Sequence, residues 1–237
     1  MASIKTPRGR YRYHKKYLYV GLKQMDRELA YENLKEIVPI LEQNGIQSGP
    51  IYGTLLGLIR EGNFIEWDED IDFYLLKEQE DQFRSALWPL REHGFELVRY
   101  DQRGLYSVMK NGEYIDFYVF RQISPGLRHM GGPDFMFEKY LKDTVEFDFK
   151  GLKLTIPRDY EEYLDFTYGD WRTPRRYTDY KPSKIVVLKM IVKDYLKNHL
   201  PKPVHFYLLK KVHAKHLEAF KQKCKSKGID IDESIHL

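Results

Sequence analysis

The apolar and polar residues follow two different periods along the chain, and each period predicts one kind of element. In residues 24–44 the apolar side chains recur every three or four positions, which predicts a helix that Gly45 ends. Pro39 lies inside this run and predicts a kink or an early end of the helix. Residues 78–93 repeat the helical spacing, and Gly94 follows them as a second stop signal.

Between these two helices the pattern changes from helical spacing to alternation. Thr54 is expected to be the N-cap of a short helix that ends at about Arg60, just before Gly62. Residues 70–76, with the sequence DIDFYLL, alternate and then become fully apolar. This change is typical of a β-strand that enters a core.

The β-rich segments FELVRY, LYSVMK and EYIDFYVF follow, separated by turn signals. Asn111–Gly112 predicts a hairpin, so the last two segments are expected to be adjacent and antiparallel. Lys150–Gly151 predicts another hairpin within VEFDFKGLKLTI. Residues 122–133 are expected to be irregular, and residues 158–167 to form a helix.

This order of elements predicts a mixed α+β fold, in which a mixed sheet is flanked by helices. We expect a basic N-terminal segment in residues 1–23, a central domain in residues 24–180, and a basic helical extension in residues 181–237. Pro201 and Pro203 are expected to break the helical extension.

Charge is distributed unevenly along the chain. Residues 1–27 contain eight basic residues and one acidic residue, and residues 172–227 contain sixteen basic residues and three acidic residues. Residues 28–171 hold fifteen basic and twenty-eight acidic residues. An acidic centre between basic ends suits a cation-dependent site for polyanions, a basic tail on anionic lipid, or plain solvated helices.

The composition excludes several classes of protein. A single cysteine, Cys224, excludes an internal disulfide framework, and 42% hydrophobic with 31% charged residues excludes wholesale disorder. The most apolar stretch, residues 184–192, is short and interrupted by Lys189, so no membrane span is expected. The basic N-terminal stretch has no apolar signal core behind it, and we therefore expect a cytoplasmic protein.

Acidic residues gather at the start of the predicted DIDFYLL strand. Asp70 and Asp72 lie two positions apart and so project from one face of that strand. Two carboxylates at a strand end make a platform for a divalent cation, because Mg²⁺ prefers oxygen ligands. Asp116, which lies among apolar residues of another strand, is a candidate third carboxylate and needs a partner. The alternatives are a solvated acidic loop after Trp67 and a locally hydrogen-bonded Asp116.

The predicted short helix supplies candidates for contacts to phosphate. A helix N-terminus with small residues can bind phosphate through its free N–H groups; Gly53 lets the backbone approach a ligand, and Thr54 can donate its hydroxyl. Arg60 can turn back to a phosphate or pair with the acidic loop. Trp67 is a candidate for stacking on a nucleobase or for a core anchor.

These motifs resemble the LicD/fukutin family of the nucleotidyltransferase-fold superfamily. GTLLGLIREGNFIEWDEDIDF is similar to the family pattern G-T-x-L-G-x-x-R followed by W-D-x-D-I-D, and YGDW with Pro174 is similar to a later family element. The resemblance covers about residues 24–180 and implies a nucleotidyltransferase-like catalytic domain there. It also implies transfer of phosphocholine, or of a polyol phosphate such as phosphoribitol or phosphoglycerol. The implied donor is CDP-activated, and the implied acceptor is a hydroxyl of a cell-surface glycan or its lipid-linked precursor.

The resemblance also implies roles for single residues. Asp70, Asp72 and Asp116 would be the catalytic carboxylates and the ligands of Mg²⁺ or Mn²⁺, as two ions. The substrate-binding candidates are Gly53, Thr54, Arg60, Trp67, Tyr168, Trp171 and Arg172. Arg175 and Arg176 are further candidates for phosphate contacts.

Two other functions fit part of the sequence. A nucleotidyltransferase that moves NMP from an NTP onto a small molecule or sugar would use the same carboxylates. A nucleic-acid or membrane-surface binding module would account for the basic C-terminal helices but would leave the three Asp residues unexplained. We therefore expect an enzyme that touches anionic membrane peripherally, at the inner membrane face, and binds no nucleic acid. His213 and His216 are interpreted as surface residues of a Lys-rich helix.

Overall fold

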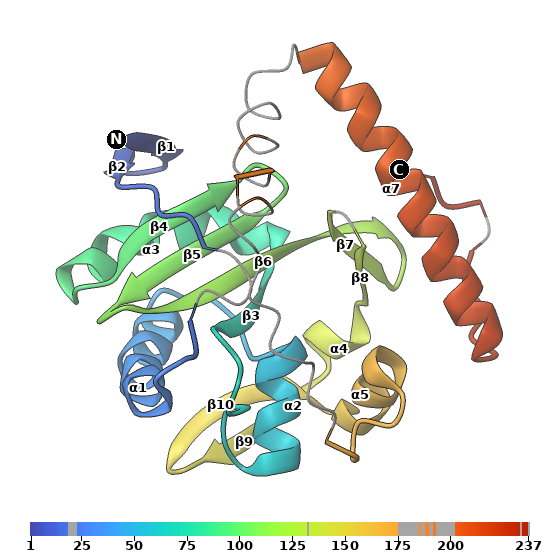
Figure 1. Cartoon of the computed structure of the whole chain (residues 1–237), viewed down its shortest axis with the longest axis horizontal. Helices are drawn as coiled ribbons and strands as arrows, with labels where there is room; N and C mark the ends of the chain where they lie inside the picture. Colours follow the sequence, from blue (N-terminus) through green and yellow to red (C-terminus); the bar gives the residue numbers. More distant parts are fainter. Residues whose placement is uncertain are drawn as a thin grey trace.

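A six-stranded mixed sheet lies at the centre of the part of the chain that the structure describes (Figure 1). The computed structural model describes residues 1–18, 23–131, 133–174, 185, 188, 189, 192, 202–232 and 234–236. The sheet consists of β3 (Ile71–Leu76), β4 (Glu96–Asp101), β5 (Leu105–Lys110), β6 (Glu113–Ser124), β7 (Leu127–Gly131) and β8 (Asp134–Phe137). Strands β4 to β8 pair antiparallel in sequence order, and β3 adds to β6 in parallel.

Helices and two small hairpins surround this sheet. The helices are α1 (Arg27–Gln43), α2 (Tyr52–Glu61), α3 (Glu80–Glu92), α4 (Lys139–Lys142), α5 (Tyr160–Tyr168) and α7 (Lys202–Ser226), and the 3₁₀ helix η1 (Lys77–Gln79) precedes α3. The hairpins are β1 (Ala2–Thr6) with β2 (Gly9–Tyr13), and β9 (Thr144–Phe149) with β10 (Leu152–Pro157). This architecture confirms the mixed α+β fold.

Helices α1 and α3 cover one face of the sheet and build the larger core. Leu34 of α1, Phe83 of α3, Phe73 of β3 and Phe117 of β6 are all buried in it. The rings of Phe83 and Phe117 lie 4.6 Å apart between centroids. This face therefore carries much of the apolar burial that stabilises the domain.

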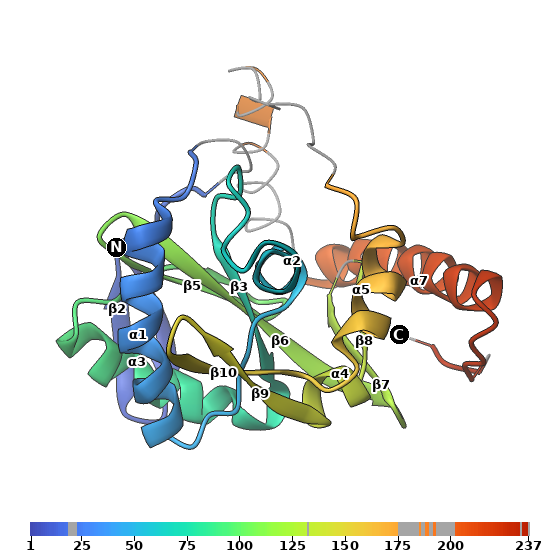
Figure 2. The same ribbon diagram turned by 90° about the horizontal axis from the view of Figure 1, so that it is seen from below.

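Helices α2 and α5 and the β9–β10 hairpin lie on the other side of β3 (Figure 2). Leu55 of α2, Tyr74 of β3, Ile156 of β10 and Leu164 of α5 form a second buried cluster there. Tyr74 and Asp72 both lie at even positions of β3, so this second face is the one that also carries the acidic residues.

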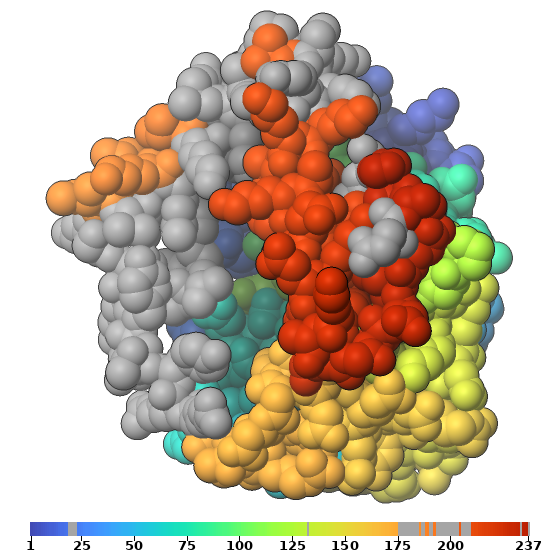
Figure 3. Space-filling model, turned by 90° about the vertical axis from the view of Figure 1, so that its right-hand side faces the viewer, coloured from blue at the N-terminus to red at the C-terminus, as the bar shows by residue number. Residues whose placement is uncertain are grey.

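Helix α7 packs on β7, β8 and α5, where Figure 3 shows it in orange and red beside the gold α5. The ring of Phe220 stacks on Phe135 at 5.0 Å and also contacts Phe137 and Phe166. Cys224 is buried in the same contact. The basic helix is thus anchored to the domain by an aromatic cluster rather than being solvated on all sides.

The N-terminal hairpin packs on α3, although the sequence reading treats residues 1–23 only as a basic segment. Ile4, Tyr11 and Tyr13 point into the main core, and Tyr11 contacts Trp88 of α3 edge to face at 5.2 Å. The intervening residues of both strands are exposed and mostly basic. An alternation of period two is therefore present in this segment.

Of the two effects predicted for Pro39, the early end of the helix is wrong, because α1 continues through Pro39 to Gln43, and the kink stays a prediction. The N-cap of α1 is Asp26, whose carboxylate accepts from the backbone N–H groups of Glu28 and Leu29. The prediction that Thr54 is an N-cap is also wrong. Helix α2 begins at Tyr52 with Ile51 as its N-cap, so Thr54 lies one turn inside rather than at the cap.

Two further predictions fail in the second half of the chain. Residues 122–133, which the sequence predicts as irregular, contain the end of β6, which runs to Ser124, and all of β7. Strand β7 pairs with β8, which begins just after this segment. Pro203 is the second residue of α7 and does not break it, because the first helical turn has no N–H bond for proline to remove. Pro201, Arg175 and Arg176 lie outside the described residues.

Among the described residues no helix combines the length and apolarity needed to cross a bilayer.

Candidate functional site

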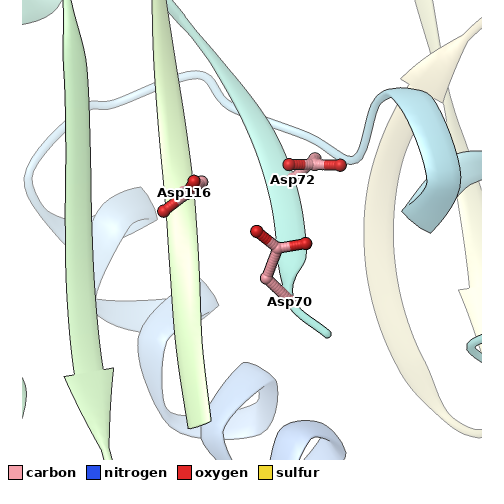
Figure 4. Close-up of side chains that lie close together, drawn as sticks. All are labelled: Asp70, Asp72 and Asp116. Carbon is pink, nitrogen blue, oxygen red and sulfur yellow. The ribbon is translucent and has the colours of Figure 1, made fainter. Parts of the chain in front are cut away.

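The parallel pairing of β3 and β6 brings three carboxyl groups together. Asp72 and Asp116 are register partners, and Asp70 precedes β3 on the same face as Asp72. Figure 4 shows the three side chains on neighbouring strands. One carboxylate oxygen from each lies within 4.8 Å of the others.

The cluster is one end of a polar row that crosses four strands. Arg99 of β4 is the register partner of Ser107 on β5, which in turn is the partner of Asp116 on β6, beside Asp72 on β3. The Arg99 guanidinium forms an ion pair with Asp116 Oδ2, and its Nε donates to Ser107 Oγ at 2.7 Å. Ser107 also hydrogen-bonds the Asp116 carboxylate. The partner that the sequence requires for Asp116 is therefore Arg99.

Burial and mutual repulsion disfavour the charged form of these carboxyl groups. Burial first, and then Asp116, Asp68 and Glu69, raise the pKa of Asp70 well above its usual value, against a lowering by Arg99. Burial raises the pKa of Asp72 in the same way, followed by Asp70 and Asp116, while a hydrogen bond from Tyr118 lowers it.

Asp116 has a different balance. Burial raises its pKa, and Arg99 and Ser107 oppose that rise. One buried and two half-buried acids held this close are unfavourable without a compensating cation, so the arrangement is one that a metal ion would stabilise.

The donor set fits a hard divalent cation. Asp116 Oδ1 is buried and receives no hydrogen bond from any described residue, whereas Oδ2 is held by Arg99. Asp70 and Asp72 add carboxylate oxygens from the adjacent strand. An all-oxygen set with two or three carboxylates is the one that Mg²⁺ or Mn²⁺ takes.

The Gly53–Thr54 pair lies next to this cluster but makes contacts within the protein. Thr54 is buried, and its Oγ accepts from the backbone N–H of Asp72 at 2.8 Å, which ties α2 to β3. A Cβ at Gly53 would lie 2.6 Å from Asp68 Oδ2, so glycine lets this carboxylate approach the start of α2 without moving aside. Burial raises the pKa of Asp68 to about 6. The start of α2 thus has a carboxyl neighbour from its own chain.

Arg60 joins α2 to the segment after α5. Its Nη1 donates to the carbonyl oxygen of Trp171 at 3.3 Å, and its Nη2 donates to Glu61 at 2.6 Å. Its Nε is buried and meets no acceptor among the described residues. Arg60 therefore pairs with Glu61, next in sequence, rather than with the acidic loop.

The remaining predicted substrate residues lie around α5 and the second core cluster. Trp171 is buried, and the Arg172 guanidinium lies 4.2 Å from its ring centroid and pairs with Asp165 of α5. Tyr168 is exposed at the end of α5, and Trp67 packs partly buried against the second cluster. The substrate roles of these four residues stay predictions.

Three residues of the site escape the sequence reading. Tyr118 lies two positions after Asp116 on β6 and hydrogen-bonds Asp72, so alternation along EYIDFYVF could have identified it. Tyr52 stacks edge to face on Tyr118 at 5.3 Å. Arg99 reaches Asp116 only through the pairing of β4, β5 and β6, which no local signal in FELVRY reveals.

Comparison with protein families confirms the resemblance seen in the sequence. Residues 50–159 match the family described as LicD/FKTN/FKRP, nucleotidyltransferase domain. An uncharacterized protein of Rickettsia typhi is 25% identical over 145 residues, which are 60% of this chain and 46% of that protein. A second uncharacterized protein, from Rickettsia prowazekii, is 24% identical over 164 residues, which are 66% of this chain and 59% of that protein. The chain spans about half the length of the curated relatives it matches.

Solved structures with some similarity include the lincosamide antibiotic adenylyltransferase LnuA with lincomycin bound and ANT(2")-Ia in complex with adenylyl-2"-tobramycin. The first is 14% identical with a TM-score of 0.42 and covers 58% of this chain and 85% of that structure. The second is 13% identical with a TM-score of 0.38, and the match covers 83% of this chain and 88% of that structure. At these scores the structures add nothing to the family assignment, which rests on residues 50–159.

Proposed function

Residues 50–159 belong to the LicD/FKTN/FKRP family of nucleotidyltransferase domains, and from this premise we propose that the protein is a LicD-type phosphotransferase. It transfers a phospho-alcohol, phosphocholine or a polyol phosphate, from a CDP-activated donor to a hydroxyl of a glycan. The family match by itself supports the coarser statement, a transferase of the phosphotransferase or nucleotidyltransferase type.

The observation that carries the proposal is the convergence of Asp70, Asp72 and Asp116 on one face of β3 and β6. These residues would hold Mg²⁺ or Mn²⁺, which when bound polarises phosphoryl oxygens and neutralises the charge that develops on them. A solvated acidic loop would not bring Asp70 and Asp72 within 4.8 Å of the buried Asp116 on another strand.

In the proposed reaction the acceptor hydroxyl attacks the phosphorus that carries the alcohol. The new bond joins the acceptor oxygen to that phosphorus, the pyrophosphate bond breaks, CMP leaves, and the hydroxyl proton passes to solvent. Arg99 and Ser107 hold the Asp116 carboxylate in place, and Tyr118 holds Asp72 through its hydroxyl. Carboxylates fixed in this way keep the reacting groups aligned at little entropic cost.

The finer assignments belong to the same proposal. Gly53, Thr54, Arg60, Trp67, Tyr168, Trp171 and Arg172 remain candidates for contacts to the donor. Two ions, a lipid-linked glycan acceptor and contact of the basic C-terminal segment with anionic membrane are likewise proposals. Of these candidates, Arg60 is supported by a buried Nε that has no acceptor among the described residues.

A donor screen tests the proposed function. The purified protein is incubated with Mg²⁺ and an acceptor glycan mixture, and with CDP-choline, CDP-ribitol, CDP-glycerol or nucleoside triphosphates in turn. Phosphorus NMR then distinguishes released CMP from released pyrophosphate. We expect CMP from at least one CDP-alcohol, no product after chelation with EDTA, and recovery on adding Mg²⁺ or Mn²⁺.

The matched variants are Asp72→Asn in the cluster and Asp81→Asn on the exposed surface of α3. The proposal is supported if Asp81→Asn still releases CMP and Asp72→Asn does not. Pyrophosphate release from a triphosphate would instead make the protein a nucleotidyltransferase, and turnover insensitive to EDTA would exclude the metal site.

A further inference from the structure

A cavity of about 260 Å³ lies between β8, α5 and α7. Figure 3 shows α7 against the elements that enclose it. Tyr52, at the start of α2, forms part of its wall, and Phe166 and Phe220 contribute from α5 and α7. The volume is slightly below the range of about 300–1,000 Å³ that is usual for small-molecule sites, so it suits one ring rather than an extended chain.

Tyr52 connects this cavity to the cluster. Its ring meets Tyr118, which hydrogen-bonds Asp72, and its hydroxyl donates to Asp134 Oδ1 at 3.2 Å on the cavity side. Its backbone N–H donates to the hydroxyl of Tyr163 at 2.9 Å. Tyr52 also has φ of 49°, a left-handed conformation that is costly for a tyrosine. The fold therefore holds the Tyr52 side chain between the carboxylate cluster and the cavity, at a cost in backbone strain.

The walls of the cavity combine aromatic faces with balanced charge. Phe135, Phe166 and Phe220 offer apolar ring surface, and Asp134 is the acid among the lining residues. His216 also lines the cavity, and the Lys223 ammonium lies 4.5 Å from the ring centroid of Phe166. Burial raises the pKa of Asp134, and the hydrogen bond from Tyr52 and the basic groups of Arg103 and His216 oppose that rise. Because basic groups already face Asp134, a ligand cation would gain little there. A neutral ring with hydroxyl groups can stack on the aromatic faces, donate to Asp134 and accept from Lys223.

We propose that this cavity is the subsite for the acceptor, and that it takes a neutral carbohydrate ring rather than an organic cation. The inference rests on the proposed function, because the subsite must lie beside the transfer centre that Tyr52 and Tyr118 connect to it. The assignment of His213 and His216 to the surface is corrected, because both are half-buried. His213 contacts His129 edge to face at 5.2 Å, and His216 lines the cavity.

The subsite depends on a part of the chain outside the family match. The match ends at residue 159, whereas Phe166, Phe220 and Lys223 follow it. Helix α7 therefore completes the acceptor subsite, and its sequence would determine which sugar the protein accepts.

Saturation-transfer NMR on the full chain, without donor, tests this inference. The probes are methyl glycosides of glucose, galactose, N-acetylglucosamine and N-acetylgalactosamine, with choline chloride for comparison. Ala219→Trp places a large ring into the cavity from an exposed position of α7, and Ala214→Trp adds the same ring to α7 away from it. Asp134→Asn replaces the carboxylate with an amide of about the same size and so removes only its charge.

We expect saturation transfer to the ring protons of at least one glycoside with the wild type, with Ala214→Trp and with Asp72→Asn. Ala219→Trp should abolish it, and Asp134→Asn should weaken glycoside binding by about tenfold. Circular dichroism of each variant shows that it is folded, and either of the two cavity variants suffices for the test.

Three outcomes would overturn the inference: no glycoside signal with the wild type, an equal signal in Ala219→Trp and Ala214→Trp, or a choline signal that depends on Asp134. Failure of the proposed function is distinguishable, since the donor screen would then release no CMP while cavity-dependent glycoside binding persists. A fourth outcome, CMP release that is unchanged in Ala219→Trp, would overturn the subsite while leaving the proposed transferase function in place.

Discussion

The two faces of β3 and β6 are built from alternate residues of the same strands, yet they have opposite chemistry. On one face Phe73 and Phe117 pack with α3 in the main core. On the other face Asp72 and Asp116 lie side by side, and Arg99 approaches Asp116 from across the sheet. One face buries apolar area and gains stability; the other gathers buried and half-buried acids whose charged forms are disfavoured.

The comparison shows that stability and chemistry are separated by a single step along each strand. Asp72 and Phe73 are neighbours in sequence, as are Asp116 and Phe117, but each pair divides between the two faces. Substitutions at adjacent positions should therefore produce different failures, one of activity and one of folding.

Asp72→Asn should give the largest effect on activity. It removes a full charge from the carboxylate cluster and leaves the fold intact, so CMP release should fall by roughly 10²–10³-fold or more. The rate of CMP release by phosphorus NMR, compared with Asp81→Asn, measures this effect. If Asp72→Asn releases CMP at the same rate as Asp81→Asn, the acidic face of the sheet is not the catalytic one and the distinction between the two faces is wrong.

Phe117→Ala should give the largest effect on stability. Its ring is fully buried between Phe73 and Phe83, and removing it should cost about 3–5 kcal/mol of the free energy of unfolding. Urea unfolding followed by circular dichroism checks the value. Below the unfolding transition the remaining folded protein should keep its Mn²⁺ binding; loss of binding together with an unchanged unfolding curve would contradict the account.

Arg99→Gln should give an intermediate effect, because Arg99 acts through Asp116. Without the guanidinium the Asp116 carboxylate loses its orientation, and Mn²⁺ affinity should fall by about 10–100-fold. Arg99→Lys should recover part of the affinity, since it restores the charge without the Nε bond to Ser107. Mn²⁺ titration of the three proteins is the measurement, and equal affinities would show that Arg99 has only a structural role.

The smallest effect concerns pH. Because the pKa values of Asp70 and Asp72 are raised in the folded protein, it keeps protons that the unfolded chain releases above a pH of about 4. Without metal, the free energy of unfolding should therefore fall as the pH rises from about 5 to about 7.5. Thermal unfolding in EDTA should show a lower Tm at the higher pH.

Asp72→Asn should flatten this fall in Tm, and Asp81→Asn should not. A Tm that rises over the same interval, or that falls equally in both variants, would contradict the assigned origin of the pKa shifts.

Local signals predict the parts of the fold that depend on neighbouring residues. The Asn111–Gly112 and Lys150–Gly151 hairpins are confirmed, and all four residues have the positive φ that such turns require. Strand β3 is confirmed as well, because alternation followed by an apolar run has few other interpretations.

Features that depend on distant pairing could not be predicted. Strands β7 and β8 have only five and four residues and lie among the turn residues of SPG and GGP, which conceal them. Arg99 reaches the site because β4 shifts register between Leu97 and Arg99. The cavity needs α7, whose aromatic contacts to β8 and α5 are invisible in a Lys-rich helical pattern.

Manganese binding tests the central claim, that the three carboxylates form a divalent-cation site, most directly. Electron paramagnetic resonance of Mn²⁺ titrated into the full chain measures the free ion without requiring any donor or acceptor. We expect the wild type and Asp81→Asn to remove Mn²⁺ from solution and Asp72→Asn to leave it free. Equal Mn²⁺ binding by Asp72→Asn and the wild type would contradict the central claim.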